Sequence, residues 1–102
     1  MIRGTTPQLT FTVPFDPTVA EKIWITFSQN KKEVFTIEKE DCKLTETTII
    51  CTLSQNQTLS LAPNATLQIQ IRVSFANGDE STALASEIIN TTVQQILKDG
   101  EI

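Results

Sequence analysis

The two cysteines are the first residues that could do chemistry. Cys42 and Cys51 are nine positions apart, a spacing that fits neither a CxxC redox motif nor a zinc site. The sequence has no histidine, so no thiolate–imidazole pair can form. If Cys42 and Cys51 face each other at a non-hydrogen-bonded pair of antiparallel strands, their geometry allows a disulfide. We expect the other arrangement, two small core thiols, because no secretory signal is visible.

Acidic side chains are the next candidates, and they gather at residues 38–41 and 79–80. Calcium takes about six to eight oxygen ligands, usually from a loop with regularly spaced aspartates, and neither segment has that spacing. The sequence also lacks a G-x-S-x-G motif, a glycine-rich phosphate loop and a histidine for acid–base catalysis. We therefore expect no metal, no cofactor and no enzymatic activity.

The single tryptophan, Trp24, is the strongest candidate for a binding residue. In an extended strand over residues 22–29 it points away from Ile23 and Ile25, toward the outer face. An exposed tryptophan anchors a protein contact or stacks on a sugar; the structural alternative is that it covers the outer face or lies under the C-terminal tail. The polar side of a later strand offers three more contact candidates: Gln68, Gln70 and Arg72.

Length and composition place these residues in one domain, residues 1–102. The chain is 39% hydrophobic and 20% charged, as is ordinary for a globular protein, and its sixteen threonines favour strands. The net charge of −4 argues against nucleic acid or an anionic membrane as a partner. Neither a signal peptide nor a membrane-length apolar run is visible, so we expect the protein in the bacterial cytoplasm.

Alternating apolar and polar residues predict about seven short strands. They cover residues 8–13, 22–29, 33–38, 41–44, 48–53, 66–75 and 81–93. A three-residue loop at 30–32 brings Phe27 opposite Phe35, and a turn between residues 46 and 47 brings Cys42 opposite Cys51.

The last strand and two short segments complete the expected elements. Asn77-Gly78 is a strong hairpin signal. The strand over 81–93 changes phase between Leu84 and Ile89, which indicates a β-bulge or a change of sheet. Residues 18–21 and 54–57 each match a capping box, so each predicts a single helical turn.

These elements predict an all-β fold, a two-layer antiparallel β-sandwich of immunoglobulin-like architecture with one or two short helical turns. The Cys-Trp-Cys spacing and the tyrosine corner of true immunoglobulin domains are absent. A small β-barrel is the alternative.

The C-terminal segment, residues 94–102, is a tail or an arm. Its apolar residues Ile96, Leu97 and Ile102 could fold back on the sandwich or add to a neighbouring subunit by β-augmentation. Self-packing is the favoured arrangement, and the three side chains are counted with Trp24 among the candidate contacts.

Several stretches carry a resemblance: residues 1–7 (MIRGTTP), residues 11–16 (FTVPFD), Asp41-Cys42, residues 86–89 (SEII) and residues 96–100 (ILKDG). They resemble small proteins encoded in prophages of Gram-positive gut bacteria (Firmicutes), over nearly the whole length. The resemblance implies a phage structural context, in a tail or baseplate. It transfers no functional residue.

We therefore expect a non-enzymatic phage or prophage structural or assembly protein that acts through protein–protein contacts. Its partners would be other phage structural proteins or further copies of itself, first in the cytoplasm and then in the virion. The alternatives are a carbohydrate- or cell-surface-binding module, in which Trp24 would hold a glycan, and a small host-directed regulatory protein.

Overall fold

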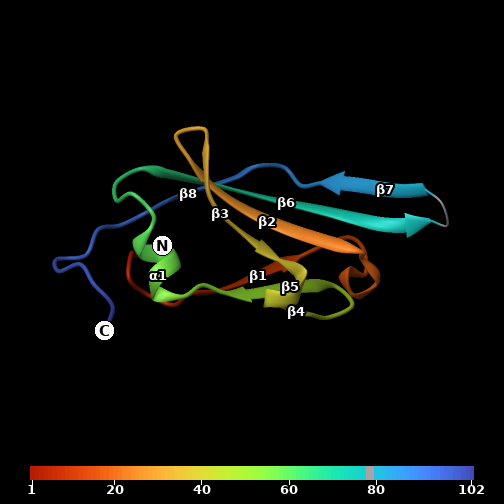
Figure 1. Ribbon diagram of the computed structural model, residues 1–102, viewed down its shortest axis with the longest axis horizontal. Helices are drawn as coiled ribbons and strands as arrows, with labels where there is room; N and C mark the ends of the chain where they lie inside the picture. The colour runs from red at the N-terminus through yellow and green to blue at the C-terminus, as the bar shows by residue number, and fades with distance from the viewer. Residues whose placement is uncertain (78–79) are drawn as a thin grey trace.

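A computed structural model describes residues 1–77 and 80–102, in which eight strands form two facing sheets (Figure 1). The elements in chain order are β1 (Gln8–Thr12), η1 (Pro17–Val19), β2 (Lys22–Gln29), β3 (Lys32–Glu38), η2 (Lys39–Asp41), β4 (Cys42–Leu44), β5 (Thr48–Thr52), α1 (Gln55–Leu59), β6 (Thr66–Asn77), β7 (Glu80–Ala85) and β8 (Ile89–Thr92). The predicted turn at Asn77-Gly78 lies partly outside the described residues.

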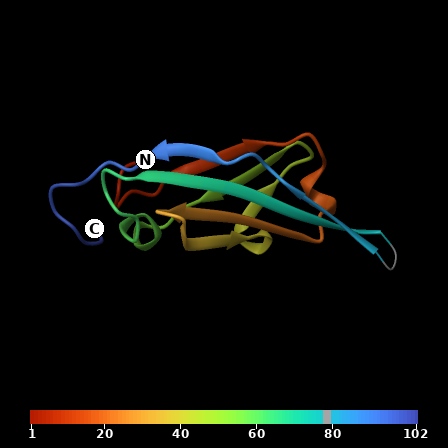
Figure 2. The same ribbon diagram turned by 90° about the horizontal axis from the view of Figure 1, so that it is seen from above.

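The strands form a sandwich rather than a closed barrel. One sheet has the order β1-β5-β4, and the other has the order β3-β2-β6-β7, with β8 also paired to β6. The described strand pairs are all antiparallel. The two sheets form an upper and a lower layer in Figure 1 and overlap when the molecule is seen from above in Figure 2. The predicted all-β sandwich is confirmed.

The β2–β3 hairpin has the predicted pairing but a shorter loop. Phe27 lies opposite Phe35, and their rings stack with centroids 4.6 Å apart. The loop holds two residues, Asn30 and Lys31, both with positive φ, instead of the predicted three. A shift of register between Phe27 and Ser28 absorbs the extra residue, so a β-bulge preserves the apolar match.

The long strand β6 pairs with two successive strands at its outer edge. β7 and β8 both join β6, so the predicted change of phase is a β-bulge within one sheet. At the break, Ser86 N–H donates to the carbonyl of Ile71 at 2.8 Å, and Ile71 N–H donates to Ser86 Oγ at 3.0 Å. The Ser86 hydroxyl thus replaces a carbonyl in the ladder.

Of the two predicted capping boxes, one is confirmed and one is wrong. Ser54 and Gln57 exchange both bonds of the box before α1. The box expected at residues 18–21 does not form, because the turn η1 starts earlier, at Pro17, and its N-cap is Asp16. Proline at the first position of a turn and an aspartate before it are a stronger start signal than a threonine.

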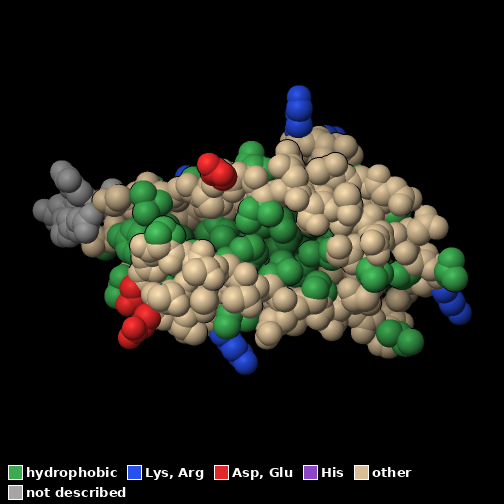
Figure 3. All heavy atoms as spheres, turned by 180° about the vertical axis from the view of Figure 1, so that it is seen from behind, with side chains coloured by type: hydrophobic (Ala, Val, Ile, Leu, Met, Phe, Trp, Pro, Cys, Tyr) green, Lys and Arg blue, Asp and Glu red, His purple; other side chains and the backbone are tan. Residues whose placement is uncertain are grey.

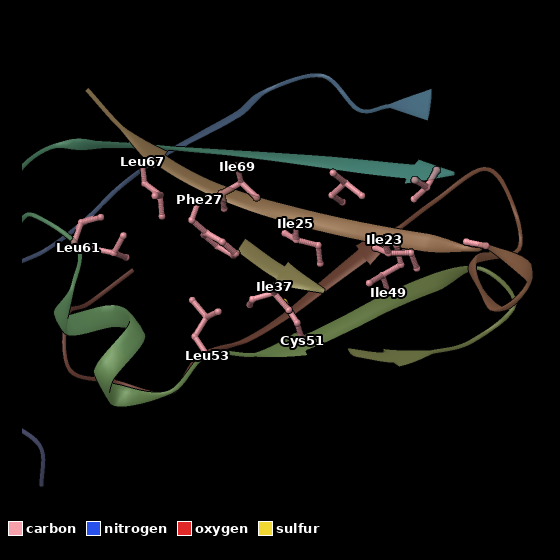
Figure 4. Packing of buried hydrophobic residues seen from close by; sticks show 14 residues of the cluster. Ile23, Ile25, Phe27, Ile37, Ile49, Cys51, Leu53, Leu61, Leu67 and Ile69 are labelled. Atoms are coloured by element: carbon pink, nitrogen blue, oxygen red, sulfur yellow. The ribbon is translucent and has the colours of Figure 1, made fainter. Parts of the chain in front are cut away.

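The core lies between the sheets and draws side chains from both (Figure 4). Its largest fully buried members come mainly from β2, β5 and β6 or from the segment around α1: Ile23, Ile25, Phe27, Ile49, Leu53, Leu61 and Leu67. Those that lie in strands occupy the inward positions, so burial in the strands follows the period of two seen in the sequence.

Strand β1 is short and lies at an edge. Among the described strands it pairs with β5 alone, and Pro7 and Pro14 stand on either side of it. Matched to an immunoglobulin sandwich, the sheet order β1-β5-β4 corresponds to B-E-D, and β3-β2-β6-β7 corresponds to C′-C-F-G. In the described residues no strand takes the position of A, beside β1.

The two ends of the described chain lie together near α1 (Figures 1 and 2). Ile2 bridges Gln94 in parallel, and Arg3 N–H donates to the Gln94 carbonyl at 3.1 Å. The Arg3 guanidinium donates to the carbonyls of Leu61 at 2.7 Å and Leu59 at 2.9 Å, near the end of α1. Arg3 therefore joins the N-terminal segment to the end of the helix.

In the described part of the chain, no helix has the length and apolar character needed to cross a membrane.

Candidate functional site

The outer face of the larger sheet brings together four predicted contact residues. Trp24 lies opposite Arg72, and the neighbouring pairs place Gln70 and Gln68 on the same face. Trp24 is 40% exposed, and the Arg72 guanidinium carbon is 5.6 Å from the centre of its ring. A cation at this distance occupies one face of the tryptophan, so the stacking surface of Trp24 is partly used within the fold.

The two glutamines on this face are engaged with the neighbouring strand region. Gln70 Nε2 donates to the Ser86 carbonyl at 3.1 Å, and Gln68 Nε2 lies 3.4 Å from Asn90 Oδ1. These bonds hold both amides along the sheet and reduce what they can offer to a ligand.

The tail residues lie apart from this face, near α1, and they differ from one another. Ile96 is half-buried, and its Cδ1 lies 3.0 Å from the position that a Cβ on Gly4 would take. Leu97 and Ile102 are fully exposed, although the backbone of Ile102 bonds to the Gln55 side chain. The tail is therefore packed at Ile96 and uncovered at its other two apolar residues.

The cysteines face each other as predicted and are free thiols. Cys42 pairs with Cys51 between β4 and β5, and the Thr45–Thr48 bond at the turn makes theirs a non-hydrogen-bonded pair. Burial raises the pKa of the Cys51 thiol to about 11, with the Cys42 charge adding to the effect. Burial, then Asp41 and Glu40, raise the pKa of Cys42. Both thiols are thus held in the protonated, poorly nucleophilic form.

The most unusual feature is an open side of the sandwich that the sequence did not single out. Leu84 pairs with Val73 and Ile89 pairs with Ile69, so both face the inside. Their partners on β6 are buried, yet Leu84 is 46% exposed and Ile89 is 41% exposed. These two inward residues lie on the edge strands of the larger sheet, beside β1, the last strand of the facing three-stranded sheet.

A groove runs along this open side, between β1 and the β7–β8 edge. It has a volume of about 510 Å³ and continues into a second hollow beside Leu9 and Ile69. Figure 3, seen from behind, shows hydrophobic side chains gathered in a hollow along the middle of this face. The groove is lined by Thr10, Phe11, Thr12, Val13, Pro14, Phe15, Ile71, Val73, Leu84, Ala85, Ser86 and Ile89. None of these side chains is charged.

The wall of the groove formed by β1 offers unpaired backbone. Bonds from Leu53 N–H to the Pro7 carbonyl and from Val13 N–H to the Thr47 carbonyl close the two ends of the β1–β5 ladder. Because bonded and non-bonded residues alternate along an antiparallel strand, every second residue of β1 turns its N–H and C=O away from β5. Those residues are Gln8, Thr10 and Thr12, and no strand in the described ranges pairs with that edge.

Sequence reasoning missed this site because it depends on how strands are divided between the sheets. For Leu84 and Ile89 the alternating pattern indicates only a change of phase between them. One signal could have revealed it. Leu84 and Ile89 are large apolar residues on the inner face of the last strand region, so they are buried only if the facing sheet is equally wide.

Within the described residues, no group of three or more His, Cys, Asp or Glu side chains could hold a metal ion. Compared with known proteins, the chain matches no family model, no curated protein and no solved structure.

Proposed function

We propose that this chain is a structural or assembly protein of a phage or prophage, associated with the tail or baseplate, that acts through protein–protein contacts. The observation that supports contact as its role is the exposure of Leu84 and Ile89 on the inner face of the sandwich. Contiguous apolar surface of this kind is typical of protein interaction sites. The resemblance to prophage-encoded proteins supplies the phage context.

The partners in this proposal are other phage structural proteins or further copies of the chain. The protein acts in the bacterial cytoplasm during assembly and then in the virion. It works without catalysis and without a cofactor.

Mass spectrometry of purified particles after prophage induction tests this function. We expect peptides of the chain at a copy number stoichiometric with known particle proteins. Abundant protein in the lysate, with none in the particles, would contradict a structural role and favour a host-directed one.

A carbohydrate- or cell-surface-binding module is the second candidate, and the exposure of Trp24 beside Arg72 favours it. Sugar rings stack on exposed tryptophans. Binding on a glycan array should then be lost in Trp24→Ala and kept in Leu97→Ala, which removes an exposed apolar side chain at the other end of the molecule. Absence of binding by the parent protein would remove this candidate.

A further inference from the structure

We propose that the groove between β1 and the β7–β8 edge binds an extended segment of another protein, which adds to β1 as an antiparallel strand and buries uncharged apolar side chains at alternate positions. This inference specifies the kind of contact that the proposed function requires. It rests on the proposed function only for the phage context. The binding chemistry follows from the groove itself.

The first argument is hydrogen bonding. The free edge of β1 presents the N–H and C=O of Gln8, Thr10 and Thr12 in the spacing of a ladder that lacks its next strand. An incoming segment in extended conformation satisfies these groups in register. Since β1 is five residues long, the paired part of the segment spans about 17 Å.

The second argument is the floor of the groove. A strand added beside β1 would lie opposite β7 and β8, and its inward side chains would cover Leu84 and Ile89. That position is the place of the absent first strand of an immunoglobulin sandwich. The ligand therefore completes the smaller sheet and extends the core that is now open to solvent.

The third argument is charge. Among the described residues no charged side chain lines the groove, and a charge that entered it would be desolvated without a partner. The inward positions of the ligand must therefore be apolar, whereas its outward positions face solvent and are free to be polar. This pattern is an alternating sequence of the kind that β-augmentation selects.

A folded second copy fits this position poorly. Antiparallel pairing of β1 with β1 of another copy, about a two-fold axis normal to the sheet, would direct the larger sheets of both molecules into the same space. β1 and the β7–β8 edge line the same groove, so this pairing would bring the β7–β8 edges of the two molecules together. The groove thus admits a single strand and excludes the edge of a complete sandwich.

The C-terminal tail of another copy is also a poor match. In an extended tail, Ile96 and Ile102 share a face with Lys98, and Leu97 shares a face with Asp99 and Glu101. Either face would place a charge in the uncharged groove. In addition, Asp99 already pairs with Arg3 at 2.6 Å.

Amide hydrogen exchange of the full chain, followed by NMR, tests the proposal with a defined probe. The probe is a capped peptide of about nine residues in which valine alternates with threonine, with a lysine at each end. Its control is the same peptide with N-methylated threonines, which cannot complete the ladder. We expect the unmodified probe to slow exchange of the Gln8, Thr10 and Thr12 amides by about tenfold or more at saturation.

Two protein variants and one matched control identify the surface. Ile89→Thr removes an apolar contact from the groove, and Thr10→Pro removes an outward N–H that β5 does not use. Each should weaken probe binding by about tenfold or more, whereas Ile88→Thr should change it by less than about twofold. Ile88 is adjacent, 52% exposed and on the opposite face, so it controls for general loss of apolar surface.

Three outcomes would overturn the proposal. They are no saturable binding up to about 1 mM probe, binding that Ile89→Thr leaves unchanged, and protection of the same amides in the protein alone that rises with concentration. The last would assign the groove to a second copy. If Thr10→Pro fails to fold, Ile89→Thr still decides the question. Probe binding by a protein absent from particles would leave the groove site standing and contradict only the phage role.

Discussion

Gly4 is the residue on which the N-terminal segment turns toward β1. It has a φ of +74°, and a Cβ there would lie 3.0 Å from Ile96 and 3.5 Å from Leu59. Gly4→Ala should therefore lower the free energy of unfolding by about 1–2 kcal/mol, through strain at positive φ and displacement of Ile96. Gly100→Ala is the matched control, since φ is also positive but nothing lies within 4 Å. Chemical denaturation measures both, and equal effects would show that packing against Ile96 contributes nothing.

The raised pKa of Cys51 makes stability depend on alkaline pH. The thiol titrates near 9.0 when unperturbed and at about 11 in the fold, so its contribution is complete below pH 9 and is lost as pH rises toward 11. The loss is on the order of 2 kcal/mol.

Urea denaturation between pH 8 and 11 checks this prediction. The parent protein should lose more stability over this range than Cys51→Ala, which is less stable throughout but has no thiol to ionise at that position. Parallel curves for the two proteins would contradict the assignment to Cys51.

At the scale of single residues, the sequence predicted pairings within hairpins better than contacts between distant strands. Alternation alone placed Cys42 opposite Cys51, because the two strands are joined by a short turn. The position of Arg72 against Trp24 could not be predicted in this way. It depends on the pairing of β2 with β6, which are far apart in the chain and whose register is set by packing of the whole core.

At the scale of elements, the β2–β3 turn contains backbone strain that one substitution can remove. Asn30 and Lys31 have φ values of 53° and 63°, and a lysine pays a steric penalty there that glycine avoids. Lys31→Gly should raise the free energy of unfolding by about 0.5–1 kcal/mol. Lys32→Gly, one position later and within β3, should lower it. Thermal or urea unfolding compares them, and a loss of stability in Lys31→Gly would refute this account.

The elements also show where sequence patterns stop being informative. The alternating period located most strands and the bulge after Leu84, since these are local properties. The predicted loop length after Gln29 was wrong. A two-residue turn needs positive φ at Lys31, and lysine is not a usual residue for that conformation. The open groove was missed because no local pattern states that one sheet will be narrower than the other.

At the scale of the whole molecule, the C-terminal tail stabilises the fold, although part of it is exposed to solvent. Removing residues 94–102 deletes the Gln94 bridge to Ile2, the packing of Ile96 and the Arg3–Asp99 pair. The free energy of unfolding should fall by about 1–3 kcal/mol, mainly from the first two.

Removal of residues 100–102 alone is the control, since it deletes only the bonds between Ile102 and Gln55. This shorter deletion should cost less than about 0.5 kcal/mol. If the longer deletion left the unfolding midpoint unchanged and altered only the mass measured by light scattering, the tail would be an assembly arm and not part of the fold.

The two prolines that flank β1 have a consequence for how the protein behaves at high concentration. An exposed strand edge can template fibres when successive chains add to it without limit. Pro7 and Pro14 cannot donate to a ladder, and the segment between them is short, so an added strand finds few places to pair. The free edge of β1 can thus stay open in the fold while the two prolines limit growth into amyloid-like polymers.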